Sequence, residues 1–277
     1  MFNALSAARV AAPLLALGAT LGGCEQNMLI NGQEGVPLAE LEIAGPPPTD
    51  VVLSSGDTVI LTNGNTFAIT VEGSDTDSLR FVRDDKVIGV TRESGWNGKG
   101  TATIRITMPP PEDVIIAGSG TVRAQNLAST SEITIGGSGL IEFGAVAAEK
   151  LGINIGGSGT VRGAGTARRL EVNIGGAGDV EMPSLKADNA EVNIGGTGDV
   201  AFASDGEVSA TIAGAGDVRV SGAAKCAVET FGSGALTCTP TSAAAAAPAA
   251  IPADMQVPQA PMVPVGPAVP AAPNRAQ

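Results

Sequence analysis

The sequence predicts an all-β protein folded as a β-solenoid, and three observations support this. Seven copies of the tripeptide Gly-x-Gly between Gly118 and Gly234 are regularly spaced, and successive copies begin 19, 20, 19, 20, 18 and 18 residues apart. Apolar residues alternate with polar ones on both sides of the glycines, which is the period of a strand. The outward positions also recur from copy to copy. Together these features predict coils of about 19 residues stacked around a continuous core.

The first 23 residues have the features of a bacterial secretion signal. Arg9 supplies the positive start, and the apolar run from Val10 to Thr20 is too short to cross a bilayer as a helix. The residues just before Cys24 (Leu-Gly-Gly) resemble a lipoprotein lipobox, in which the cysteine becomes the lipidated first residue. We therefore expect a signal peptide over residues 1–23 and a lipid anchor on Cys24. An ordinary secretory signal beside an unrelated cysteine is the alternative.

Two further segments flank the predicted solenoid and show no strand period. Residues 24–50 contain three consecutive prolines and are expected to be a linker after the lipidated cysteine. Residues 240–277 are rich in alanine and proline, a composition that favours a disordered or partly polyproline-like tail. The folded part is therefore expected to span residues 51–239.

Within the folded part, residues 51–112 differ from residues 113–239. The first segment shows strand alternation without regular glycines, so we expect it to form opening coils and a cap on the N-terminal end of the core. A separate domain is the alternative. The second segment holds the seven repeats, and its inward column after the glycines is Val122, Ile141, Val161, Val180, Val200, Val218 and Leu236.

Outward columns should bring related side chains together along the stack. Arg123, Glu142, Arg162 and Glu181 occupy one column, so in-register stacking predicts alternating opposite charges as neighbours. Asn154, Asn173 and Asn193 form a second column, with Thr134 and Thr211 in register. Stacked asparagines of this kind stabilise neighbouring coils through side-chain hydrogen bonds.

The composition excludes several classes of function. A net charge of -12 disfavours nucleic acid as a partner, because phosphate recognition needs clustered positive charge. The chain has no histidine, which removes the commonest general base and metal ligand, and we expect no cofactor. The glycines do not form a nucleotide loop either. The run from Gly157 to Gly163 has one residue too many for a dinucleotide fingerprint and continues as a strand.

Asp179, Asp199 and Asp217 fall in one column directly after the glycines and are the candidate cation or glycan face. Stacked carboxylates repel one another unless water or a cation separates them, so a solvated stripe and a cation site are both open. Closely spaced carboxylates also suit a retaining glycosidase. However, no aromatic residue flanks the column, and the single tryptophan, Trp96, lies well outside it.

Cys226 and Cys238 flank the last Gly-x-Gly turn. In an oxidising compartment we expect these two cysteines to pair and to clamp the terminal coil, with two free thiols as the alternative. The chain has no Cys-x-x-Cys motif, so a redox pair is disfavoured.

The order of these features resembles the auto-transporter adhesin, head GIN domain family over residues 50–239. The matching features are a strand, polar turn and strand ending in Val-Glu-Gly (Val59–Gly73), a strand that ends in proline (Ile104–Pro109) and a β-Gly-Ser-Gly-β unit (Val114–Val122), followed by the repeats. The three consecutive prolines at 109–111 depart from the single proline of the family pattern. The resemblance implies a single-stranded right-handed β-helix in the cell envelope, often with a lipoprotein signal, and carries over no catalytic residue.

The sequence thus leads to a non-enzymatic cell-envelope lipoprotein that acts as a structural or adhesin-like binding module. The expected partners are the membrane, through the lipid anchor, and a polysaccharide or another envelope protein. We expect the protein at the outer membrane or facing the periplasm. The alternative is a carbohydrate-active enzyme, or a cation-dependent polysaccharide binder, that uses Asp179, Asp199 and Asp217.

Overall fold

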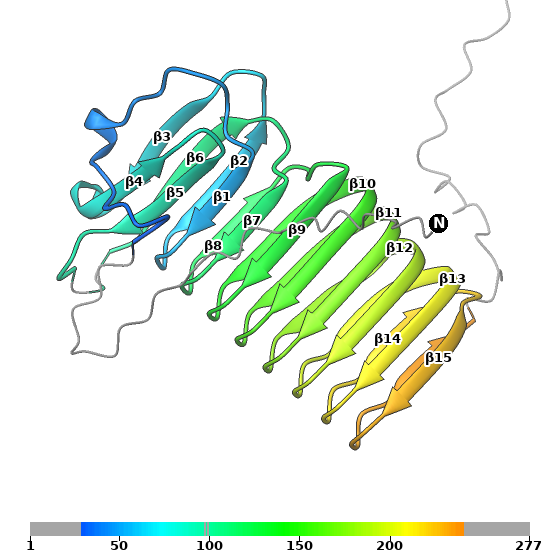
Figure 1. Ribbon diagram of the computed structural model, residues 1–277. Coiled ribbons are helices and arrows are strands. Elements are labelled where there is room, and N and C mark those ends of the chain that lie inside the picture. Colours follow the sequence, from blue (N-terminus) through cyan, green and yellow to red (C-terminus); the bar gives the residue numbers. More distant parts are fainter. Residues whose placement is uncertain (1–28, 97, 99, 241–277) are drawn as a thin grey trace, which may run out of the picture. The chain divides into compact units, whose positions relative to one another are not determined.

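The fold is an all-β stack in which each coil pairs in register with the coil before it (Figure 1). The computed structural model describes residues 29–96, 98 and 100–240, so the predicted signal peptide, Cys24 and residues 241–277 lie outside the described residues. Two short 3-10 turns, η1 (Leu38–Glu40) and η2 (Thr76–Ser78), are the helical elements described. No helix in the described ranges has the length and apolar character needed to span a membrane. The predicted all-β fold class, a β-solenoid with coils of about 19 residues, is confirmed.

Each coil of the repeat region contributes one strand to each of two layers that face each other across the core. Four long strands bend in the middle, so that the first half of each lies in one layer and the second half in the other. These are β10 (Leu140–Ile155), β11 (Thr160–Ile174), β12 (Asp179–Ile194) and β13 (Val200–Ile212). Shorter strands complete the layers: β7 (Asp113–Ile116), β8 (Thr121–Ala124), β9 (Thr130–Ile135), β14 (Val218–Ser221), β15 (Lys225–Thr230) and β16 (Leu236–Thr239).

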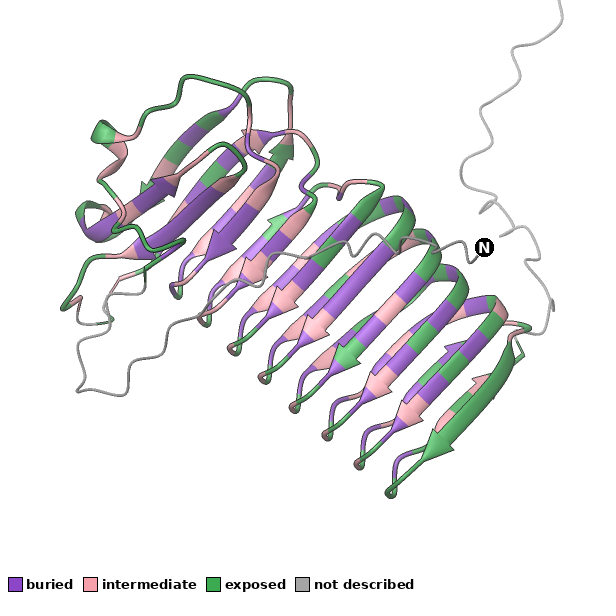
Figure 2. Ribbon diagram, viewed as in Figure 1, coloured by how far each residue is buried: buried purple, intermediate pink, exposed green. Residues whose placement is uncertain are grey.

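The core is built from the predicted inward columns. Parallel register aligns Val161 with Ile141 on one side and with Val180 on the other, and all three side chains are fully buried. The same alternation of buried and exposed positions runs along every long strand (Figure 2). Because each coil covers the apolar column of the previous one, the core is continuous along the stack.

The Gly-x-Gly turns require glycine because successive coils approach too closely for a side chain. None of these turn glycines adopts a positive φ. Instead, a Cβ on the first glycine of a turn would lie 1.8–2.2 Å from the carbonyl oxygen of the equivalent glycine in the previous coil. This holds for Gly137, Gly157, Gly176, Gly196, Gly214 and Gly232.

The N-terminal strands are stacked out of sequence order. β1 (Asp50–Leu53) and β2 (Thr58–Asn63) form a coil that pairs with β7 and β8 on its inner side. On its outer side the same coil pairs with β5 (Val87–Arg92) and β6 (Ala102–Met108), which come later in the chain. The outermost coil of this end therefore comes later in the chain than the coil that it covers.

Two antiparallel strands close this end of the stack. β3 (Ala68–Gly73) pairs with β6, and β4 (Leu79–Arg83) pairs with β5. Their apolar residues join the same hydrophobic core as the repeats. Residues 29–49 then pack on the outside of the cap. Val36 exchanges backbone hydrogen bonds of 2.9 and 2.8 Å with Phe81, and the Ile30 side chain is buried among neighbouring apolar residues.

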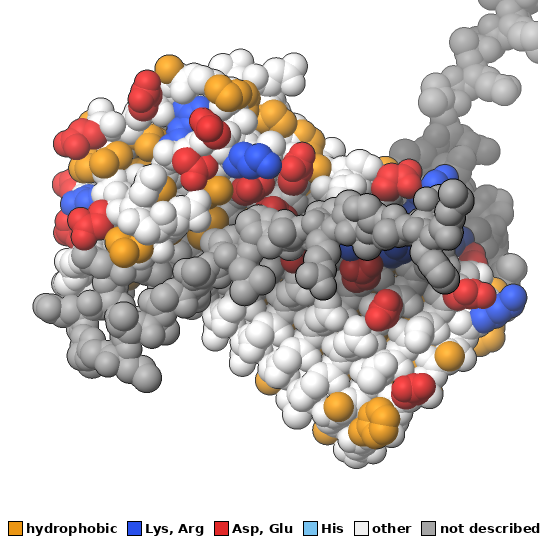
Figure 3. All heavy atoms as spheres, in the orientation of Figure 1, with side chains coloured by type: hydrophobic (Ala, Val, Ile, Leu, Met, Phe, Trp, Pro, Cys, Tyr) orange, Lys and Arg blue, Asp and Glu red, His pale blue; other side chains and the backbone are white. Residues whose placement is uncertain are grey.

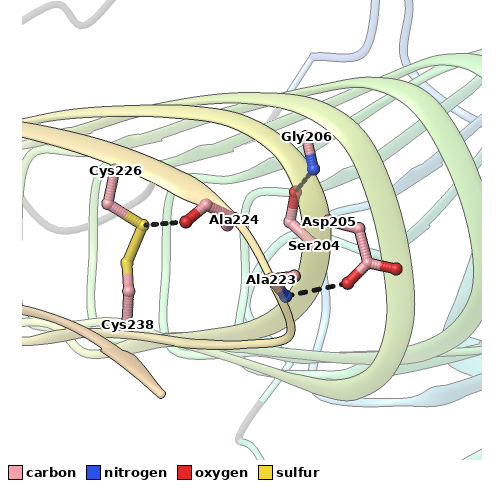
Figure 4. The surroundings of a disulfide bond; sticks show 7 residues. All are labelled: Ser204, Asp205, Gly206, Ala223, Ala224, Cys226 and Cys238. Carbon is pink, nitrogen blue, oxygen red and sulfur yellow. Dashed lines mark hydrogen bonds between the residues drawn. A yellow bond between two sulfur atoms is a disulfide. The ribbon is translucent and has the colours of Figure 1, made fainter. Parts of the chain in front are cut away.

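The last coil is held by a disulfide between Cys226 of β15 and Cys238 of β16. The bond joins the two layers across the end of the core (Figure 4). Just before it, the Asp205 carboxylate accepts a 2.9 Å hydrogen bond from the backbone N–H of Ala223, which fixes the preceding bend to the coil before it.

Candidate functional site

The predicted column of Asp179, Asp199 and Asp217 lies at the turn end of the coils, and its carboxylates connect one coil to the next. Asp179 Oδ1 accepts the backbone N–H of Asp199 at 3.0 Å, and Asp199 Oδ1 accepts that of Asp217 at 2.9 Å. Asp217 Oδ1 continues the series by accepting the N–H of Ala235 at 3.1 Å. Each aspartate therefore satisfies a backbone donor that the turn leaves without a strand partner.

A protein cation bridges two members of this column. The Arg219 guanidinium lies 3.1 Å from Asp199 Oδ2 and 3.2 Å from Asp217 Oδ2. The N–H of Asp217 and the Arg219 guanidinium hold the pKa of Asp199 below its usual value. Within the described residues, no three acidic, cysteine or histidine side chains are grouped so that they could hold a metal ion. Carboxylate repulsion in this column is thus relieved by hydrogen bonds and by Arg219.

The predicted charge column is confirmed, and it lies in the same layer as the aspartates, with Glu181 two residues after Asp179 in β12. Glu142 lies between two arginines, with its Oε2 2.7 Å from Arg123 Nε and its Oε1 4.0 Å from Arg162. Arg162 Nε also lies 2.7 Å from Glu181 Oε2. All of these side chains are substantially exposed, so each pair contributes little to stability.

The predicted asparagine column is also confirmed, and it forms a hydrogen-bonded ladder across coils. Asn193 Nδ2 donates to Asn173 Oδ1 at 3.1 Å, and Asn173 Nδ2 donates to Asn154 Oδ1 at 3.0 Å. Asn154 Nδ2 ends the ladder by donating to Glu132 Oε1 at 2.7 Å. Thr134 and Thr211 flank it in register.

Two more outward columns run beside this ladder on the same layer. One is mainly acidic, and its register brings Asp50, Asp113, Glu132, Gly152, Glu171 and Glu191 into line. The other carries Thr130, Lys150, Arg169, Asn189, Glu207 and Lys225. We call these two columns and the asparagine ladder together the polar face.

Partial burial and the crowding of acidic side chains on the polar face raise the pKa of Asp113. Its partial burial and the nearby charges of Asp50, Glu132 and Glu112 raise the pKa of Asp113 to about 6. Lys86 opposes this shift without cancelling it. The N-terminal part of the polar face therefore gains negative charge as the pH rises through about 6. Farther along, Lys150 Nζ pairs with Glu171 Oε2 at 2.8 Å.

Two shallow grooves follow the polar face. One has a volume of about 630 Å³ and includes Asp113, Glu132, Asn154 and Asn173 in its lining. The other, of about 530 Å³, extends towards the C-terminal coil and includes Arg169, Glu191 and Lys225. Glu171 lines both grooves, so they follow one another along the stack. On the face that Figure 3 shows, charged side chains gather over the N-terminal strands, and few are seen at the glycine turns.

The cap also contains a buried ion pair that the sequence analysis did not predict. Asp57 and Arg92 have side chains that are 1% and 5% exposed, and Arg92 Nε donates to Asp57 Oδ2 at 2.8 Å. Ser55 Oγ and the N–H of Ala102 also donate to this carboxylate, at 2.7 and 2.8 Å. Burial alone raises the pKa of Asp57, but the hydrogen bonds from Arg92, Ser55 and Ala102 outweigh it and lower the pKa below its usual value.

Comparison with known families identifies the family of this chain. The model of the family described as "Putative auto-transporter adhesin, head GIN domain" matches residues 47–224, well over half of the sequence. The chain belongs to this family. No curated protein matches the chain.

Solved structures show the head GIN domain fold at low sequence identity. A putative adhesin from Bacteroides fragilis superimposes with a TM-score of 0.64 at 19% identity, over 69% of this chain and 92% of that one. A putative adhesin from Parabacteroides merdae gives 0.57 at 16% identity, over 70% and 92% of the two chains. A putative lipid binding protein from Parabacteroides distasonis gives 0.56 at 18% identity, over 71% and 94%. The family description points to an adhesin-like protein of the bacterial cell envelope, and the solved structures show the shared fold.

Proposed function

We propose that this head GIN domain protein is a lipoprotein, anchored through Cys24, whose polar face binds an extended, hydroxyl-rich polymer such as a polysaccharide. The observation that carries the proposal is the asparagine ladder beside the two grooves. It presents the same hydrogen-bonding group at three successive coils, in the direction along which an extended polymer would lie.

The ladder leaves hydrogen-bonding capacity unused. An asparagine amide has two N–H donors and an oxygen that accepts two hydrogen bonds. Asn154 and Asn173 each use one donor and one acceptor position within the ladder, and among the described residues their second N–H has no partner. Neighbouring coils are about 4.8 Å apart, so a polymer along the stack would meet a donor and an acceptor at each step.

The charge of the polar face favours a neutral polymer. Carboxylates outnumber the basic residues Lys150, Arg169 and Lys225 there, and Asp113 adds charge above about pH 6. An anionic polymer would be repelled at low ionic strength. No aromatic residue is among those that line the two grooves, so sugar binding would depend on hydrogen bonds.

Lipidation of Cys24 would place the cap close to a membrane. Leu29, where the described structure begins, is five residues after Cys24, a span of at most about 18 Å. Cys24 lies outside the described residues, so its lipidation rests on the lipobox-like sequence and on the envelope character of the family.

A polysaccharide-binding assay tests the role of the polar face. Insoluble envelope polysaccharide from the source bacterium is incubated with the wild type and with the Asn154→Ala/Asn173→Ala double variant. We expect the variant to bind at least about tenfold more weakly, because it loses two repeated hydrogen-bonding groups. Arg162→Ala/Glu181→Ala, on the other layer, is the matched control and should bind like the wild type. Equal binding by all three proteins would rule out the polar face.

The same incubation addresses the enzyme alternative. Release of reducing ends by the wild type that disappears in Asp199→Asn would establish catalysis by the aspartate column. Asparagine keeps an acceptor oxygen for the N–H of Asp217, so the turn is preserved while the carboxylate is lost. We expect no release from either protein, since these carboxylates already bind backbone donors and Arg219.

Palmitate labelling combined with protease shaving of intact cells tests the anchor. We expect label on the wild type and none on Cys24→Ala. Labelled protein that is also shaved would lie on the cell surface, as an adhesive role requires. Labelled protein that is protected would face the periplasm, and absence of label from the wild type would contradict the anchor.

A further inference from the structure

We propose that the C-terminal coil is a self-association surface through which two copies of this chain join end to end into a two-fold symmetric dimer. In that dimer, β15 pairs antiparallel with β15 of the second copy, and β16 pairs with β16. The two stacks then share one continuous pair of layers.

The first observation is that antiparallel strands cover one end of the stack and leave the other end uncovered among the strands described. The N-terminal end is closed by the antiparallel strands β3 and β4. At the C-terminal end, β15 pairs with β13 alone and β16 with β14 alone, among the strands described. Every residue of β15 is exposed, as Figure 2 shows. Uncovered strand edges of this kind readily pair with another chain.

The second observation is that this end exposes apolar side chains that point towards the core. Val228 is aligned with the buried Ala210 of the previous coil but is 46% exposed, since no further coil of the described structure covers it. Leu236 and the Cys226–Cys238 disulfide lie at the same end of the core. Phe231, in the adjoining turn, is 72% exposed. A second copy would complete the missing layer of the core.

The backbone groups of β15 are oriented so that a two-fold axis can pair this strand with β15 of the second copy. The N–H of Phe231 donates to Ile212 of β13 at 2.7 Å. Because alternate residues of a strand direct their N–H and C=O to opposite sides, Cys226 and Val228 present both groups to the open edge. A two-fold axis through Ala227 places Cys226 opposite Val228 of the second copy, and the two residues then exchange both backbone hydrogen bonds.

The backbone groups of β16 are also oriented so that a two-fold axis can pair this strand with β16 of the second copy. The carbonyls of Ala235 and Thr239 accept hydrogen bonds from β14 and from Gly222, so Leu236 and Cys238 present their backbone groups to the open edge. An axis through Thr237 places Leu236 opposite Cys238 of the second copy. The disulfide puts Cys226 across the core from Cys238 (Figure 4). Because the two strands run in opposite directions, Ala227 then lies across from Thr237, and one axis serves both layers.

Side-chain charge supports the same register. With the axis at Ala227, Lys225 of one copy lies directly opposite Glu229 of the other, and this pair occurs twice because of the symmetry. Inward residues also meet inward residues, so each disulfide contacts Val228 and Leu236 of the other copy. A shift by one residue would place inward residues opposite outward ones. The charges therefore select a second copy as the occupant of this edge.

Sedimentation equilibrium of the full chain tests the proposal. The protein carries Cys24→Ala, so that lipid does not cause association. We expect a monomer–dimer equilibrium at about 100 µM or below, and a purely monomeric protein at that concentration would overturn the proposal.

Charge exchange then tests the register. Lys225→Glu and Glu229→Lys each create two like-charge pairs and should weaken dimerisation about tenfold or more. The double variant Lys225→Glu/Glu229→Lys restores opposite charges and should recover the wild-type dissociation constant. Thermal unfolding of each variant checks that the fold is kept, as expected at exposed positions. Single variants that dimerise like the wild type, or a double variant that stays weak, would refute this register.

A truncation distinguishes the second copy from the chain's own C-terminal residues. If the wild type is monomeric and removal of residues 241–277 makes it dimeric, those residues occupy the edge and the proposal is wrong. If both forms dimerise and respond alike to charge exchange, a second copy is the occupant.

Discussion

Replacing Gly157 with alanine is expected to destabilise the protein by about 3 kcal/mol or more, or to prevent folding. A Cβ at this position would lie 2.0 Å from the carbonyl oxygen of Gly137, and it would also approach the oxygen of Gly136 at 2.7 Å. Both atoms belong to the backbone, so no side chain can rotate away. The two coils would have to separate, which breaks parallel hydrogen bonds on both sides of the turn. Urea unfolding of the purified variant measures the loss.

Gly156→Ala is the matched control because it makes the same chemical change one residue earlier. No heavy atom lies within 4 Å of a Cβ built on Gly156. We expect a change of less than about 0.5 kcal/mol, since alanine meets no obstacle there and reduces the freedom of the unfolded chain. Equal stability of the two variants would show that close approach does not explain the turn glycines.

Asp57→Asn is the second substitution expected to have a large effect. It removes the buried counter-charge of the Arg92 guanidinium and leaves the half-exposed Asp75 carboxylate, 3.9 Å away, as its acidic neighbour. Breaking a buried ion pair in this way costs about 3–5 kcal/mol. Arg92→Met should cost a similar amount, since it leaves the Asp57 carboxylate buried and also removes the stacking of Arg92 on Trp96, 4.6 Å from the ring centre. Arg105→Met, in the exposed pair with Glu72, is the control and should cost less than about 1 kcal/mol.

The same pair determines how stability responds to acid. The pKa of Asp57 is lowered by folding, so its stabilising contribution is present above the unfolded pKa of about 3.9 and is lost as the pH falls through the folded value. We expect the wild type to lose stability below about pH 4 and Asp57→Asn to show a weaker dependence there. Thermal unfolding between pH 2 and 7 measures both curves, and parallel curves would contradict this role for Asp57.

Much of the repeat region could be predicted from the sequence because the repeat length of a solenoid determines which residues come into contact. Residues about 19 apart become neighbours, so Arg123 and Glu142 could be paired, and the asparagine ladder located, by alignment of the copies. The alternation of Val and Ile with polar residues identified the inward columns. The cysteines on either side of the last turn, Cys226 and Cys238, indicated the closing disulfide.

The aspartate column shows where such reasoning stops. Its alignment was apparent from Asp179, Asp199 and Asp217, and repulsion between stacked carboxylates was the natural expectation. The sequence does not show that each carboxylate faces a backbone N–H of the next coil, or that Arg219 reaches back across two of them. These contacts depend on the path of the turn, which a residue pattern does not specify.

What the sequence alone determined, then, is the repeating framework: the all-β class, the coil length, the inward columns and the outward ladders. The tertiary structure decided the path of the turns and the contacts that occur once. The insertion of β1 and β2 between later strands, the pairing of Asp57 with Arg92 and the unequal ends of the stack have no periodic signature. The physical reason is that repeated contacts follow from one coil geometry, which every coil of the stack adopts. Single contacts depend on how distant segments pack, and only the folded chain brings those segments together.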